Sequence, residues 1–204
     1  AREKVVVLGE YDRAESSPFF RLDQRIGQVV WGDFWSRKNT IGDRDVISNV
    51  TSEQMRTIRD LYYVPNNSAL IVSGAVDPDA TLALIRTVLG DWPRGADPFV
   101  RAPVPAVAPL TKSRALIVED EVNAVTVQIQ WHGPPARADE AATFAADVYS
   151  DLLNQPTSRF QQRLVDNGLW QGVIVNYYTL ANVGPITVSG QTTPEKLRAA
   201  LAAL

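Results

Sequence analysis

Two acidic residues near the start of the chain, Glu3 and Glu10, have a spacing that lets them act together. Seven residues span about two turns of an α-helix, so both carboxylates would project from one face of it. A carboxylate on a rigid helix is a suitable ligand for zinc, which accepts oxygen, nitrogen and sulfur donors. The same spacing also describes a solvated helix face, and from spacing alone that second interpretation is better supported.

The composition limits every other kind of site. The 204 residues include no cysteine and a single histidine, His132. Thiolate metal centres, disulfides and cysteine nucleophiles are therefore excluded, and a site with two or three imidazoles cannot be built from these residues alone. His132 is followed by Gly-Pro-Pro, and we expect a turn or surface residue there in preference to a metal ligand.

Charge and hydropathy argue against two classes of partner. The formal net charge is −3 and the isoelectric point about 5.2, which leaves no basic field for nucleic acid or anionic lipid. No run approaches the roughly 18 consecutive apolar residues of a membrane span. With 45% hydrophobic and 21% charged residues, the chain is typical of a globular protein. Its Ala- and Arg-rich composition indicates a bacterial source and leaves both periplasm and cytoplasm open.

The elements that must position these residues fall into two halves. Four prolines in the thirteen residues from Asp97 to Pro109 predict a linker, because proline neither donates to a β-ladder nor continues a helix. We assign residues 1–97 to the C-terminal part of a first domain, 98–112 to the linker, and 113–204 to a second domain truncated at its C-terminus. Strand pairs that alternate with helix pairs predict an α+β fold, with helices on one face of an antiparallel sheet.

Local patterns predict where the helices and strands lie. Helices are predicted at residues 2–12, 19–30, 51–63, 77–89, 139–153, 158–167 and 194–204. Strands are predicted at residues 69–74, 115–119, 124–131, 171–178 and 185–189. Residues 31–50 carry two glycines and several Asp and Asn residues, so we expect them to be irregular. Because both ends of the chain read as helix, we expect a fragment of a longer protein.

Four motifs follow one another in a definite order along the chain. They are Glu3-Lys4-Val5-Val6-Val7-Leu8-Gly9-Glu10, then Ile41-Gly42 with Asp45-Val46-Ile47, then the stretch from Leu61-Tyr62-Tyr63-Val64-Pro65-Asn66 to Gly74-Ala75-Val76-Asp77, and finally Pro156-Thr157-Ser158-Arg159-Phe160 to Leu169. In this order and spacing they resemble zinc peptidases of the insulinase/pitrilysin type, and the resemblance extends over the whole chain.

This resemblance implies repeated α+β domains that enclose a peptide, with zinc held by the two His of an H-x-x-E-H motif and by a Glu on a later helix. Glu10 falls on the position of that Glu, and Glu3 on an acidic position that supports the site. The H-x-x-E-H motif would lie roughly 75 residues before Glu10. We therefore expect this chain, taken alone, neither to bind catalytic zinc with three ligands nor to cleave peptides.

The resemblance also implies an Arg and a Tyr, seven residues apart, that contact the substrate and the oxyanion in the half that completes the site. The corresponding residues here are Arg163 and Trp170, and an indole does not replace a phenol. We expect a second half or subunit to supply that pair, and Arg163 to be a surface residue in preference to a substrate contact. Two functions remain open: part of a zinc-dependent endopeptidase or oligopeptidase, or a non-catalytic family member that supports an active partner.

Overall fold

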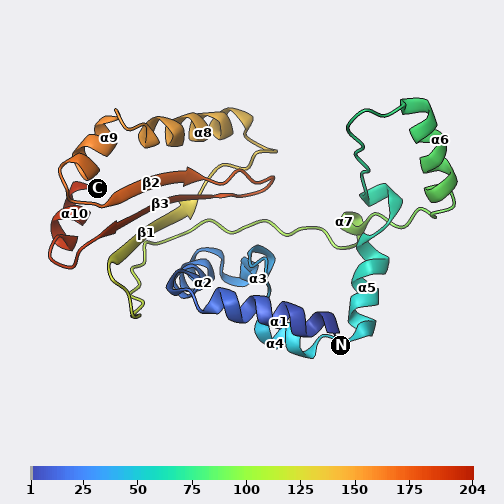
Figure 1. The fold of residues 1–204 in the computed structure, drawn as a ribbon, viewed down its shortest axis with the longest axis horizontal. Helices are drawn as coiled ribbons and strands as arrows, with labels where there is room; N and C mark the ends of the chain where they lie inside the picture. The colour runs from blue at the N-terminus through green and yellow to red at the C-terminus, as the bar shows by residue number, and fades with distance from the viewer. Residues whose placement is uncertain (1) are drawn as a thin grey trace. The chain divides into compact units, whose positions relative to one another are not determined.

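In the computed structural model, which describes residues 2–204, the chain divides into two compact units (Figure 1). The first unit joins the residues up to Arg44 with Val107–Leu204, and the second is Asp45–Ala106. The division into residues 1–97, 98–112 and 113–204 stays a prediction about the domains of the longer protein.

Two helices open the first unit, α1 (Arg2–Glu15) and the amphipathic α2 (Pro18–Trp31), as the sequence predicts. Pro18 occupies the first turn of α2, where its missing N–H costs nothing. Gly32 ends α2 with a positive φ of 51°, a conformation that glycine adopts without a steric penalty.

The expectation that residues 31–50 are irregular is wrong in part. A 3₁₀ turn (Gly32–Phe34), α3 (Trp35–Lys38) and α4 (Arg44–Asn49) follow α2. These segments have three, four and six residues, so each is too short to produce a periodic pattern that sequence analysis detects.

A three-stranded antiparallel sheet forms the centre of the first unit. The strands are β1 (Val125–His132), β2 (Gly172–Tyr177) and β3 (Pro185–Thr192), in the order β1-β3-β2. The register places Val127 and Val173 on either side of Gly190. A Cβ at Gly190 would come within 2.8 Å of the Trp170 ring, so glycine gives this indole room to lie against the sheet.

One face of the sheet is buried under helices, as expected for the α+β class. In β2, Val173, Val175 and Tyr177 are buried while the residues between them are exposed, because successive side chains of a strand point to opposite faces. The buried face is covered by α8 (Glu140–Asn154), α9 (Arg159–Gln161) with the π-helical turn Gln162–Asp166 that continues it, and α10 (Leu197–Ala203) (Figure 1). The core cluster consists of Leu164, Trp170, Val173 and Ala200.

Side chains from the covering helices close the outer edge of β2. The Asn154 side chain donates from Nδ2 to the Val175 carbonyl at 2.6 Å, and its Oδ1 accepts from the Val175 N–H at 2.9 Å. Gln161 Nε2 donates to the Val173 carbonyl at 3.0 Å. These bonds satisfy backbone groups that an open edge would expose to pairing with another chain.

Two predicted strands do not form. Residues 69–74 and 115–119 are extended without ladder hydrogen bonds to any described residue, and Ile71 and Ile117 are 88% and 91% exposed. A strand needs a neighbour as well as a suitable sequence, and no described segment pairs with either run.

The second unit consists of helices and connecting segments: α5 (Ser52–Tyr62), a 3₁₀ turn (Pro65–Asn67), α6 (Pro78–Leu89) and α7 (Pro98–Arg101). Thr51 and Gln54 form a capping box, and Asp77 Oδ1 accepts from the N–H groups of Asp79 and Ala80. The proline-rich segment is irregular except for α7, where Pro98 stands in the first turn. Among residues 2–204 we find no helix with the length and apolar character needed to cross a membrane.

Candidate functional site

Helix α1 presents both acidic candidates to solvent. Glu3 and Glu10 are exposed and lie on a helix that is uninterrupted from Arg2 to Glu15. Neither carboxylate makes a hydrogen bond or an ion pair with any residue of the described chain. The helix therefore holds two unused carboxylates about 10 Å apart along its axis, on one face.

Contacts at the other end of α1 fix its direction. The Tyr11 ring packs edge-to-face on Phe20 of α2, with ring centroids 5.4 Å apart. Arg44 forms ion pairs with Asp12 and Glu15, and its guanidinium lies over the Tyr11 ring at 5.3 Å. The hydrogen bond to Asp12 raises the pKa of Arg44 above its usual value. These contacts hold the helix that carries Glu10, while the Glu10 carboxylate itself has no partner among residues 2–204.

The described residues do not complete a metal site. No group of three His, Cys, Asp or Glu side chains among residues 2–204 is arranged to hold a metal ion. A catalytic zinc site uses three protein ligands and one open position. Glu10 fits as one oxygen ligand on a rigid element, and the other two would have to come from outside the described residues.

His132 lies where the sequence places it, at the end of β1, but it belongs to the strand and not to a turn. Its ring stacks on Trp31 at a centroid distance of 4.8 Å, and Nε2 lies 3.0 Å from the Val30 carbonyl oxygen. Lys38 Nζ lies 4.3 Å from the centroid of the Trp31 ring and donates to the Val183 carbonyl at 2.7 Å. This half-buried cluster anchors α2 and α3 to the end of the sheet, so the role of His132 is structural.

Arg163 and Trp170, the pair compared with the Arg and Tyr of the family, have different environments. Arg163 is exposed on the π-helical turn, in agreement with a surface role. Trp170 is 3% exposed, and its Nε1 donates to the Ala200 carbonyl at 3.2 Å. The indole is therefore part of the hydrophobic core.

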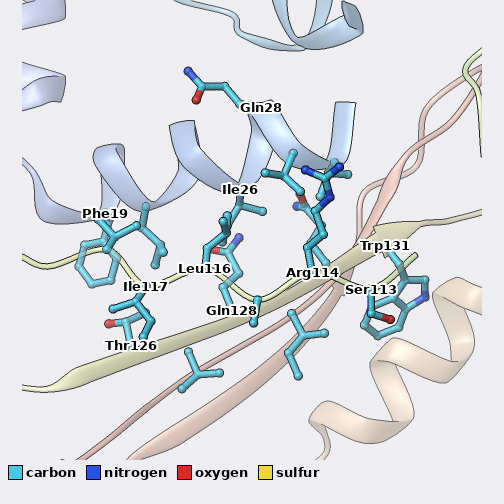
Figure 2. Close-up of a pocket in the computed structure, with 18 of the residues that line it drawn as sticks. Phe19, Ile26, Gln28, Ser113, Arg114, Leu116, Ile117, Thr126, Gln128 and Trp131 are labelled. Carbon is cyan, nitrogen blue, oxygen red and sulfur yellow. The ribbon is translucent and has the colours of Figure 1, made fainter. Parts of the chain in front are cut away.

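A large hollow in the first unit was not predicted. It has a volume of about 1520 Å³ and lies between α2 and β1 (Figure 2). Phe19 and Ile26 form part of its apolar wall on α2, and Thr126 and Gln128 part of its polar wall on β1 (Figure 2). The extended segment 109–119 lines it from one side. The hollow is formed by residues about 100 positions apart in the sequence, so no local sequence pattern predicts it.

Polar groups at this hollow tie its walls together. Arg21 Nε lies 3.0 Å from Asp120 Oδ2, an ion pair that lacks the alignment of a hydrogen bond, and the Asp120 side chain is 12% exposed. On the same helix, partial burial raises the pKa of Asp23, and a hydrogen bond with Gln128 of β1 opposes that rise. These groups join α2 to the sheet and to the segment before β1. They do not provide a nucleophile with an adjacent base.

Comparison with known proteins identifies the class. The family profile described as Peptidase M16 inactive domain matches residues 49–204, about three quarters of the chain. The chain belongs to this family of the M16 peptidases, the group that includes the insulinase and pitrilysin types. The family assignment and the fold predicted from the sequence are thereby confirmed.

Three similar proteins illustrate the relationship. The "Uncharacterized zinc protease YmfH" of Bacillus subtilis is 24% identical over 100 residues, 49% of this chain and 23% of that protein. The "Probable zinc protease PqqL" of Escherichia coli is 27% identical over 132 residues, 62% of this chain and 14% of that protein. A protease from Helicobacter pylori has the same fold, with a TM-score of 0.81 at 22% identity over 99% of this chain and 50% of its own. The chain thus spans half or less of each of these relatives.

Proposed function

We propose that this chain is part of a zinc-dependent endopeptidase or oligopeptidase, and that α1 supplies one zinc-ligating carboxylate, Glu10. The observation that carries the proposal is the state of that side chain. Glu10 is exposed, has no partner among residues 2–204 and lies on a helix held by its neighbours; it also falls on the position that the family resemblance gives to a zinc ligand. The names of two relatives, both described as zinc proteases, support the choice of metal.

The chemistry assigns different tasks to the two carboxylates. When bound, zinc lowers the pKa of a coordinated water so that it attacks a peptide carbonyl near neutral pH. Glu10 holds one coordination position from a rigid helix. Glu3, two turns away, would accept a hydrogen bond from the outer ring nitrogen of a ligating imidazole and so orient it.

The remainder of the chain has a supporting role in this proposal. Residues 49–204 match a domain described as inactive, and Glu3 and Glu10 lie outside that range. The sheet and its covering helices form a wall that encloses peptide. Because a buried Trp170 stands where the family resemblance implies a Tyr, the Arg and Tyr that contact substrate would come from a second half or subunit.

The test is the zinc content of the full-length gene product, measured by mass spectrometry of the metal, in three forms: native, Glu10→Gln and Glu53→Gln. Glu53 is an exposed glutamate in the first turn of α5 and serves as the matched control. Glu10→Gln should lose most of the bound zinc and the peptide-cleaving activity, while Glu53→Gln should retain both. Full zinc occupancy in Glu10→Gln would remove Glu10 from the ligand set.

A second function has one observation in its favour. Most of the chain matches an inactive domain, which is the expected result for a non-catalytic subunit that supports an active partner. In that case the native full-length protein would contain no stoichiometric zinc and would cleave peptides only after its partner is added. The measurement above therefore separates the two functions before any substitution is made.

A further inference from the structure

Individual side-chain contacts, and not a buried face, hold α1 in the first unit. Among residues Arg2–Glu15 none is buried. A helix in a protein usually gains most of its stability by packing an apolar face, so α1 depends more than most helices on single contacts. One of these is the edge-to-face contact of Tyr11 with Phe20 of α2.

Three further contacts on α1 come from one residue, Arg44. Its Nη1 donates to Asp12 Oδ1 and lies 3.6 Å from Glu15 Oε2. Its guanidinium carbon lies 5.3 Å from the centroid of the Tyr11 ring. Tyr11 and Asp12 precede Glu15 by four and three residues, so the three side chains share one face of the helix. A planar, permanently charged guanidinium can contact an aromatic ring and two carboxylates at the same time.

Glu10 directly precedes this group of residues, and its position is sensitive to rotation of the helix. An α-helix with its side chains is about 10–12 Å across, so a carboxylate lies about 5 Å from the axis. A rotation of about 10° then moves that carboxylate by about 1 Å. Ligand distances in a metal site are defined to within about 0.2 Å. A helix that rotates by this amount would not keep Glu10 in a ligand position.

We propose that Arg44 is a positioning residue for Glu10. By holding one face of α1, it fixes the rotation of the helix about its axis and thereby the place of the Glu10 carboxylate. This inference rests on the proposed function, in which Glu10 is a zinc ligand. The side chains of Arg44, Asp12 and Glu15 are 44%, 59% and 52% exposed. Because exposed ion pairs contribute little to folding, the effect of Arg44 falls on zinc retention and not on stability.

The experiment measures zinc release from the full-length gene product to an excess of a chromogenic chelator. Arg44→Gln should release zinc at least about fivefold faster than the native protein. The matched control is Arg59→Gln, because Arg59 is an exposed arginine that forms an ion pair with Asp60 on α5, in the second unit. It should release zinc within about twofold of the native rate. Equal release rates for the two variants would overturn the proposal.

Two readouts separate positioning from other roles of Arg44. Loss of a positive charge near zinc would by itself slow zinc release, so a slower rate in Arg44→Gln would show a field effect and overturn the proposal. The Tm of Arg44→Gln should agree with that of Arg59→Gln to within about 2 °C. A larger loss would assign Arg44 a structural role and would also overturn the proposal.

A combination of variants tests whether Arg44 acts through α1. The double variant Asp12→Asn, Glu15→Gln removes the two carboxylates that Arg44 contacts. It should release zinc faster than the native protein, and adding Arg44→Gln to it should give little further increase, because the same contacts are lost. Independent, multiplicative effects on the rate would contradict the proposal.

A further measurement follows the helix without reference to zinc. Spin labels on cysteines introduced at Val6 of α1 and Ile174 of β2, which are 50% and 57% exposed, report the position of α1 relative to the sheet. The distance distribution from double electron–electron resonance should broaden in Arg44→Gln and stay unchanged in Arg59→Gln. An unchanged distribution in Arg44→Gln would overturn the proposal.

Failure of this inference and failure of the proposed function are distinguishable. If Glu10→Gln keeps its zinc, the proposed function fails and this inference fails with it. If Glu10→Gln loses its zinc while Arg44→Gln releases zinc at the native rate, only the positioning role of Arg44 is overturned.

Discussion

Replacement of Trp170 by phenylalanine tests whether this residue belongs to the core and not to a peptide-binding surface. The indole is 3% exposed and donates to the Ala200 carbonyl, which also accepts from the Leu204 N–H at 3.2 Å. Loss of the indole N–H therefore leaves the carbonyl with one partner, so the cost is an ordinary hydrogen bond, about 1 kcal/mol. The smaller ring leaves a void that costs about 1 kcal/mol more.

The two terms predict that Trp170→Phe lowers the free energy of unfolding by about 2 kcal/mol. Urea denaturation followed by far-ultraviolet circular dichroism measures this quantity. Trp131→Phe is the matched control, because Trp131 lies on β1 of the same sheet and is 40% exposed; it should cost less than about 0.5 kcal/mol. If the two variants lose equal stability, or if Trp170→Phe loses less than about 0.5 kcal/mol, the core assignment is refuted.

Three further predictions concern the sheet and its helices. Asn154→Ala should cost about 2 kcal/mol in urea denaturation, since both bonds to the Val175 backbone disappear. Asp139→Ala should cost about 1 kcal/mol, because Asp139 Oδ1 caps α8 by accepting from the Ala142 N–H. In the same urea denaturation it should therefore lose less stability than Asn154→Ala. Burial lowers the pKa of Lys38 below 10.5, so folding penalises its charged form and stability should rise with pH as the pH approaches 10.5 from below. Lys38→Met should abolish that rise; an unchanged pH profile would show that another group causes it.

The features that sequence analysis predicted correctly are those with a local cause. The predicted helices at residues 51–63 and 77–89 form as α5 and α6, and the Thr51 capping box and the Asp77 cap at which they begin each depend on a few neighbouring residues. The strands β1, β2 and β3 also followed from alternation, because their partners are present in the chain. The order of these locally predicted helices and strands was sufficient to predict the α+β class.

The features that the sequence did not disclose depend on distant residues. His132 stacks on Trp31, about 100 residues away, so its structural role has no local signature. Residues 69–74 and 115–119 have the composition of strands. A strand also needs a second strand to pair with, and neither segment pairs with another described strand. The burial of Trp170 follows from the position of α10, which is encoded 27 to 33 residues later.

The candidate site shows the same limit. Its ligand helix was predicted from spacing and resemblance, and the structure confirms that α1 is a helix with both carboxylates exposed. Whether Glu10 binds zinc depends on residues that are not among those described, and it stays a prediction. The hollow between α2 and β1 was missed, because its two walls are separated by about 100 residues.

The most direct test of the account is a crystal structure of the full-length gene product with anomalous diffraction measured at the zinc absorption edge. If Glu10 is a zinc ligand, one strong anomalous peak should lie about 2.0–2.2 Å from its carboxylate oxygen, with two imidazole nitrogens completing the protein ligands. A zinc peak whose ligands all lie elsewhere, with the Glu10 carboxylate still in solvent, would contradict it.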